Sequence, residues 1–212
     1  MSDHAKDSGD NGKGAKALEC VYIIGAQCTG KTTLVNALEN YFEDGSWSGR
    51  ATKPYIVHEV ARQVLSSCKL DGTYILNSAD QTIHIQTKIL EAQCLAESKL
   101  DGVWYIADRS ALDAVVYAAR YAGTAASRKL TDSDAWKTLY PRLETGLIIL
   151  CPPVLKWLTE DGLRLIPHDV DDWMSIHSLF IRTLKDVNLK FETIPQDLED
   201  IGGRVSFVLE RL

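Results

Sequence analysis

The chain has 212 residues and a formal net charge of -6, with 45% hydrophobic and 25% charged residues. This length and composition predict one globular domain of ordinary size with a buried core. The acidic balance argues against a surface that binds double-stranded nucleic acid, so a polyanionic substrate would need a local basic pocket. No apolar run approaches the roughly 18 residues that a membrane-spanning helix requires.

The five cysteines are odd in number and form no C-x-x-C pair, and the five histidines show no metal-ligand spacing. This pattern predicts neither a disulfide framework nor a zinc site. Reduced thiols are typical of a protein in the cytoplasm or nucleus.

Residues 1–17 are polar and lack the apolar centre of a signal peptide, so we interpret them as a disordered tail before one domain at 18–212. Within that domain, short β-rich apolar runs alternate with segments of helical spacing. The predicted strands are residues 20–24, 54–58, 103–107, 146–151 and 190–194. The predicted helices are residues 31–42, 59–68, 78–100, 110–121, 171–187 and 203–212. Because no tight hairpin signal joins two strands, the predicted fold class is α/β, with a five-stranded parallel sheet flanked by helices on both faces.

A glycine-rich turn joins the first strand to the first helix and matches the pattern G-x-x-x-x-G-K-[ST] over Gly25–Thr32. Its glycines let successive backbone N–H groups point into one concavity of phosphate size, and the following helix directs its positive end at the same place. Lys31 adds a charge for the β- and γ-phosphates, and the hydroxyl of Thr32 is a ligand for Mg²⁺. The alternative is a turn without a ligand. The residues predicted to bind ATP or GTP are Gly25, Ala26, Gln27, Cys28, Thr29, Gly30, Lys31, Thr32 and Thr33.

Asp108 and Arg109 follow the third predicted strand, at the carboxyl edge where ligands of open α/β sheets bind. A carboxylate there can hold a Mg²⁺-bound water, and an arginine beside it can bind a phosphate oxygen. Thr32 and Asp108 are therefore the predicted metal residues. The alternative for this pair is an ordinary ion pair at a helix entry.

Two further charged positions follow other strands. Glu59 ends the second strand, where a carboxylate would accept the proton of an acceptor hydroxyl, and Arg62 follows one turn later. The alternative for Glu59 is an acid favoured by the helix dipole. Arg164, in the segment 160–164, suits a mobile lid over the transferring phosphoryl group, although a solvated loop has the same composition. The predicted catalytic residues are Lys31, Glu59, Asp108, Arg109 and Arg164.

The set of motifs resembles a known family. Its members are the small AAA-like P-loop domains related to bacterial ribosylnicotinamide kinase domains, fungal members in particular. The resemblance runs from residue 20 to the C-terminus and rests on V-Y-I-I-G-A-Q-C-T-G-K-T-T-L, H-E-V-A-R, D-R-S-A-L-D and E-D-G-L-R. It implies strand order 2-3-1-4-5, Mg²⁺-nucleotide in the P-loop, and a lid role for Arg164. It also implies an acceptor pocket bounded by Glu59, Arg62, Asp108 and Arg109.

Two functions follow from this resemblance. The first is ATP-dependent phosphoryl transfer to a small hydroxylated metabolite, with a nucleoside such as nicotinamide riboside as the leading candidate. The second is a nucleotide-dependent switch or adaptor with slow hydrolysis of ATP or GTP. The chain lacks N-K-x-D, and the residues after the third strand do not match D-x-x-G, which argues against a Ras-like GTPase. The expected partners are a nucleotide and a small-molecule acceptor, and the oligomeric state stays open.

Overall fold

A computed structural model describes residues 20–45, 52–70, 78–157 and 169–212 of the chain. The tail predicted at residues 1–17 lies outside these residues. Five parallel strands form one sheet in the order β2-β3-β1-β4-β5, which confirms the predicted fold class and strand order. The strands are β1 (Cys20–Ile24), β2 (Tyr55–Val57), β3 (Tyr105–Asp108), β4 (Leu147–Leu150) and β5 (Glu192–Thr193).

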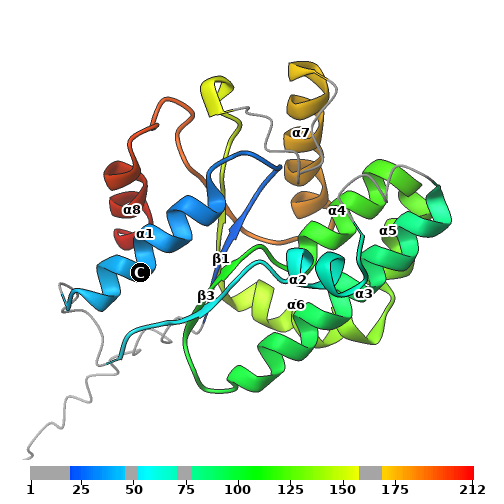
Figure 1. Ribbon diagram of the computed structural model, residues 1–212, viewed down its shortest axis with the longest axis horizontal. Helices are drawn as coiled ribbons and strands as arrows, with labels where there is room; N and C mark the ends of the chain where they lie inside the picture. Colours follow the sequence, from blue (N-terminus) through cyan, green and yellow to red (C-terminus); the bar gives the residue numbers. More distant parts are fainter. Residues whose placement is uncertain (1–19, 46–51, 71–77, 158–168) are drawn as a thin grey trace, which may run out of the picture.

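Helices cover both faces of this sheet (Figure 1). On one face lie α1 (Lys31–Glu43) and α8 (Ile201–Leu209). On the other face lie α2 (Val60–Ser67), α3 (Ala79–Glu97), α4 (Ala111–Ala122), α5 (Thr124–Thr131), α6 (Asp134–Thr145) and α7 (Val170–Asp186). No helix among the described residues is long and apolar enough to cross a membrane.

The central strand β1 is buried on both sides because it lies between two helical layers. Val21 and Ile23 pack into the cluster that contains α1 and α8, whereas Tyr22 and Ile24 pack into the cluster on the opposite face. The sequence of a strand that is buried on both faces is a continuous apolar run, without alternating polar residues. The parallel register brings Ile23 of β1 beside Asp108 of β3, so the carboxyl ends of these two strands meet at one edge.

Two helices, α5 and α6, have no counterpart among the predicted elements. Gly123, with φ +85°, separates α4 from α5, and the Ser133 side chain caps α6. α6 contains Pro141 and is polar on its outer face, which hides the helical spacing of Trp136, Leu139 and Leu143. β5 is also shorter than predicted, with two residues in place of five, because this edge strand pairs with β4 alone.

Candidate nucleotide-binding site

The P-loop lies between β1 and α1 and adopts a backbone that needs glycine at two places. Gly25 has φ +140°, and a Cβ there would lie 2.6 Å from the carbonyl oxygen of Cys151. Gly30 has φ +78°, and a Cβ there would lie 2.9 Å from the ring of Trp157. Cys28 also has a positive φ of 58°. The loop is therefore curled tightly against its surroundings, as a phosphate-binding concavity requires.

Helix α7 and helix α4 hold the loop from outside. The indole Nε1 of Trp173 in α7 donates a 2.7 Å hydrogen bond to the backbone carbonyl of Gln27. The hydroxyl of Tyr117 in α4 donates a 2.8 Å bond to the side-chain oxygen of the same residue. A carbonyl that is engaged on the outside leaves neighbouring N–H groups free to face inward. Sequence patterns did not identify Trp173 or Tyr117, since buried aromatic residues at helical spacing look like ordinary core.

Lys31 is 4% exposed and points along the loop. Its Nζ donates to the carbonyl oxygen of Ala26 at 2.5 Å and lies 3.3 Å from the hydroxyl of Thr29. Burial and, to a smaller extent, the nearby charge of Arg109 together lower the pKa of Lys31 to about 8. Among the described residues no carboxylate lies within ion-pair distance of this ammonium. An incoming anion would therefore supply a counter-charge that the ammonium lacks.

The two predicted metal residues lie in contact. The hydroxyl of Thr32 donates a 2.6 Å hydrogen bond to Oδ2 of Asp108, which ends strand β3. Asp108 is 2% exposed, and its second oxygen is buried without a hydrogen-bond partner in the described part of the chain. A carboxylate and a hydroxyl are the hard oxygen ligands that Mg²⁺ prefers, and Mg²⁺ commonly uses one or two carboxylates with substrate phosphates and waters. The residues thus fit a magnesium ion, and no cluster of three or more acidic, His or Cys ligands is found among the described residues.

Arg109 connects the remaining predicted residues. Its Nε lies 2.8 Å from Glu59, the residue that precedes α2, and one terminal nitrogen lies 3.3 Å from Asp113 in α4. Burial alone would raise the pKa of Glu59, but the charge of Arg109, its hydrogen bond, and Arg62 lower that pKa to about 2. Arg109 also has φ +82°, a left-handed conformation that costs a non-glycine residue about 1–3 kcal/mol. Such strain persists where surrounding contacts hold a side chain in a required place.

Asp113 lies at this site but is not among the residues predicted from the sequence. Its side chain forms a capping box with Ser110 at the start of α4. It is also 3% exposed and ion-paired to Arg109, four residues earlier in the chain. The spacing in D-R-S-A-L-D, with the arginine four residues before the second acid, is the signal that would have indicated this pair.

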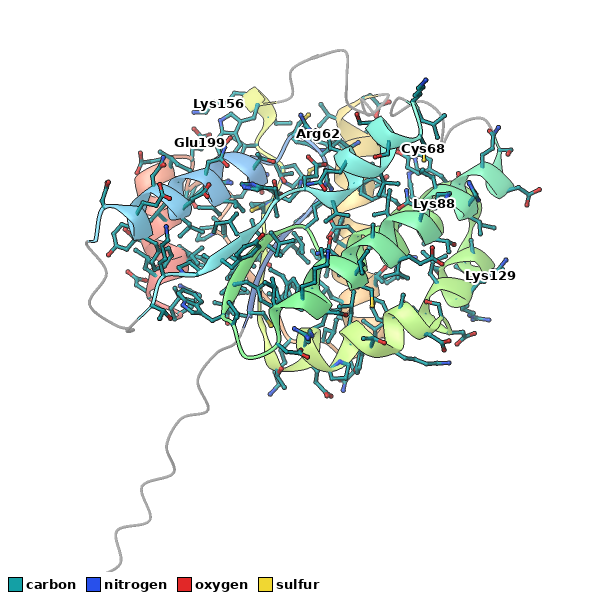
Figure 2. All side chains as sticks on the ribbon, turned by 60° about the horizontal axis from the view of Figure 1, so that its bottom comes forward. Arg62, Cys68, Lys88, Lys129, Lys156 and Glu199 are labelled. Carbon is teal, nitrogen blue, oxygen red and sulfur yellow. The ribbon has the colours of Figure 1, made fainter. Side chains whose placement is uncertain are left out.

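Those predicted catalytic residues that the structure describes therefore lie close together beside the P-loop. Figure 2 shows Arg62 on α2, and its side chain lies 3.3 Å from Glu59. Arg164 lies outside the described residues. One pocket is lined by Cys28, Thr29, Gly30, Lys31, Thr32, Glu59 and Arg109.

Comparisons with known proteins agree with this geometry. A family model described as an AAA domain matches residues 20–200. No curated protein matches the chain. Among solved structures, the NadR protein in complex with NR has a TM-score of 0.64 and 21% identity, and the match covers 91% of this chain. The chain spans about half the length of that protein, with 51% of it covered.

Two further structures share the fold. Shikimate kinase from Acinetobacter baumannii, in complex with shikimate, has a TM-score of 0.54, 12% identity and 92% coverage of both chains. Deoxyadenosine kinase from M. mycoides, with products dCMP and dCDP, has a TM-score of 0.57 and 14% identity, and the match covers 91% of this chain and 97% of that one. At these identities the likeness shows the fold, and it confirms the P-loop topology predicted from the sequence.

Proposed function

We propose, from the premise that this chain belongs to the AAA domain family, that it is a kinase. The reaction would transfer the γ-phosphoryl group of ATP to a hydroxyl group of a small metabolite. The observation that carries this proposal is that Lys31 and the Glu59–Arg109 ion pair line one pocket. A nucleotide switch needs the phosphate loop but does not need a carboxylate that lines the same pocket as the P-loop lysine.

The P-loop amides and Lys31 would bind the nucleotide phosphates, and the Lys31 ammonium would regain a counter-charge on binding. Thr32 and Asp108 would hold Mg²⁺. Mg²⁺, when bound, neutralises charge on the phosphate oxygens. Each of these groups acts by position and charge, which supply most of the catalysis in phosphoryl transfer.

Glu59 is our candidate for the base. The acceptor oxygen forms a bond to the γ-phosphorus, the bond between that phosphorus and the bridging oxygen breaks, and the hydroxyl proton passes to the Glu59 carboxylate. In the unliganded protein, the ion pair with Arg109 keeps the pKa of Glu59 near 2, so this carboxylate is ionised but weakly basic. A phosphate oxygen that attracts Arg109 away would raise that pKa and make Glu59 a better proton acceptor.

For the acceptor we propose a nucleoside, with nicotinamide riboside as the first compound to test. The support is that the NadR structure contains NR and that a second similar structure is a deoxynucleoside kinase. Shikimate kinase acts on another hydroxylated metabolite, so sugars and hydroxy acids belong in the same experiment.

The experiment measures nucleotide consumption and product mass with a panel of nucleosides, nucleotides, sugars, hydroxy acids and 5′-hydroxyl oligonucleotides. Each acceptor is tested with MgATP and MgGTP, and Lys31→Ala is the inactive control. The proposal predicts that one class gives a product heavier by a single phosphoryl group. Slow hydrolysis alone across the whole panel would refute the kinase and favour the switch.

A further inference from the structure

Arg204 in helix α8 is a fully buried arginine next to the P-loop. Its terminal nitrogen Nη1 donates a 3.1 Å hydrogen bond to the backbone carbonyl of Thr29. Its Nε donates a 2.7 Å bond to the backbone carbonyl of Leu198, which precedes the helix. The guanidinium carbon lies 4.3 Å from the centre of the Trp157 ring. One guanidinium therefore joins α8, the loop before it and the phosphate loop.

The surroundings of Arg204 do not explain the buried arginine as a contribution to the stability of the fold. Burying a cation without a counter-charge is costly, and among the described residues no carboxylate forms an ion pair with it. Its second terminal nitrogen is buried and has no hydrogen-bond partner in the described part of the chain. An arginine retained only to stabilise the core would be expected to have its N–H groups paired.

The position of Thr29 explains what the arginine does. Thr29 comes directly before Gly30 and Lys31, so its carbonyl and the following amides belong to one curved segment. An outside donor that holds the carbonyl directs the adjacent N–H groups toward the concavity. Trp157 covers the guanidinium and also contacts the loop, since a Cβ at Gly30 would lie 2.9 Å from its ring.

A surface ion pair joins the segment that carries Trp157 to the loop before α8. Lys156, beside Trp157, pairs with Glu199 in the loop before α8, and Figure 2 shows the two side chains together at the surface. The short 3₁₀ helix Leu155–Trp157 is thereby tied to the segment that carries Leu198. The hydrogen bond from Arg204 to Thr29 is buried, which makes it stronger than an exposed one.

We propose that Arg204 is a positioning residue for nucleotide binding that sets the shape of the P-loop through the Thr29 carbonyl. This inference rests on the proposed binding of nucleotide at that loop. The single ammonium of lysine cannot donate to both the Thr29 and Leu198 carbonyls in the planar geometry of a guanidinium. It also cannot stack on the Trp157 ring as a planar group does. Loss of these two hydrogen bonds would let the P-loop adopt conformations in which its backbone amides no longer point into one concavity.

The test compares Arg204→Lys with the matched control Arg211→Lys. Arg211 follows the same helix, stacks on the Phe207 ring at 3.5 Å and donates to the Phe207 carbonyl at 2.8 Å, but it does not contact the P-loop. Calorimetry with MgATP should show about tenfold weaker binding for Arg204→Lys, the factor that a hydrogen bond from a charged group typically contributes. The control should bind like the wild type.

A second readout needs no nucleotide. Cys28, 7% exposed in the same loop, should react several times faster with a thiol reagent in Arg204→Lys, while thermal unfolding stays close to the control. Peptide mass spectrometry separates Cys28 from the exposed Cys68. Equal MgATP affinity and equal Cys28 reactivity in the two lysine variants would overturn the proposal.

A second pair of variants keeps the test decisive if Arg204→Lys does not fold. Trp157→Leu removes the ring that covers the guanidinium, whereas Trp157→Phe retains an aromatic face. The proposal predicts faster Cys28 alkylation in the leucine variant only, and equal rates would refute it. If the wild type binds no nucleotide at all, the proposed function fails, but the Cys28 rates still decide whether Arg204 sets the loop.

Discussion

Replacement of Lys31 by methionine should stabilise the nucleotide-free protein while abolishing nucleotide binding. The side chain is 4% exposed, and its burial lowers the pKa from 10.5 to about 8. At 1.36 kcal/mol for each pH unit, this shift corresponds to about 3 kcal/mol of unfavourable free energy for the buried ammonium at neutral pH. Methionine has a similar length and carries no charge, so it removes this cost.

The gain is smaller than the full shift because the ammonium also makes contacts. The hydrogen bond to the Ala26 carbonyl, 2.5 Å long, is lost in the variant, at a cost of about 1 kcal/mol. We expect a net stabilisation of about 2 kcal/mol at pH 7. For a domain of this size, that difference raises the midpoint of thermal unfolding by about 5 °C.

The direction in which the stability difference changes with pH tests whether the buried ammonium causes it. Below pH 8 the lysine is charged in both states, so the folded wild type bears the whole cost. Between pH 8 and 10.5 the folded state releases the proton and the unfolded state retains it, so the wild type gains stability as pH rises. The advantage of Lys31→Met should therefore shrink and disappear near pH 10.

Denaturant unfolding followed by circular dichroism at pH 7 and pH 10 measures the difference. Lys129→Met, at an exposed lysine of α5 seen in Figure 2, is the control and should change stability little at either pH. The reasoning is wrong if Lys31→Met is less stable than the wild type at pH 7. It is also wrong if the difference between the two proteins is the same at both pH values.

Three further predictions concern the site. Glu59→Gln should leave MgATP affinity nearly intact but lower acceptor phosphorylation by about 10²–10⁴-fold, the usual contribution of a general base; wild-type turnover would exclude this role. Asp108→Asn removes the carboxylate that accepts from Thr32, so half-maximal activity should require more Mg²⁺; an unchanged Mg²⁺ titration would contradict the metal assignment. Saturating MgATP should slow alkylation of Cys28, which lines the pocket, and equal rates with and without nucleotide would count against the loop geometry.

The sequence alone determined the fold class and the phosphate loop because both depend on local signals. Strand β1 is a short apolar run, the glycines of the loop adopt positive φ, and helix α1 begins at Lys31. The sequence also predicted that Asp108 and Glu59 lie near this loop, since the carboxyl ends of parallel strands meet at one edge of the sheet. The strand order came from the family resemblance and not from the residues themselves.

Only the tertiary structure decided which side chains hold this site in place. Arg109 binds Glu59 across 50 residues of chain, and Arg204 binds Thr29 across 175. Tyr117 and Trp173 reach Gln27 from helices that looked like ordinary core in the sequence. Local patterns carry the conformational preferences of a few neighbouring residues, whereas these contacts depend on how the helices pack against the sheet. A lone arginine or tryptophan in a helix carries no sign of the distant carbonyl to which it will donate.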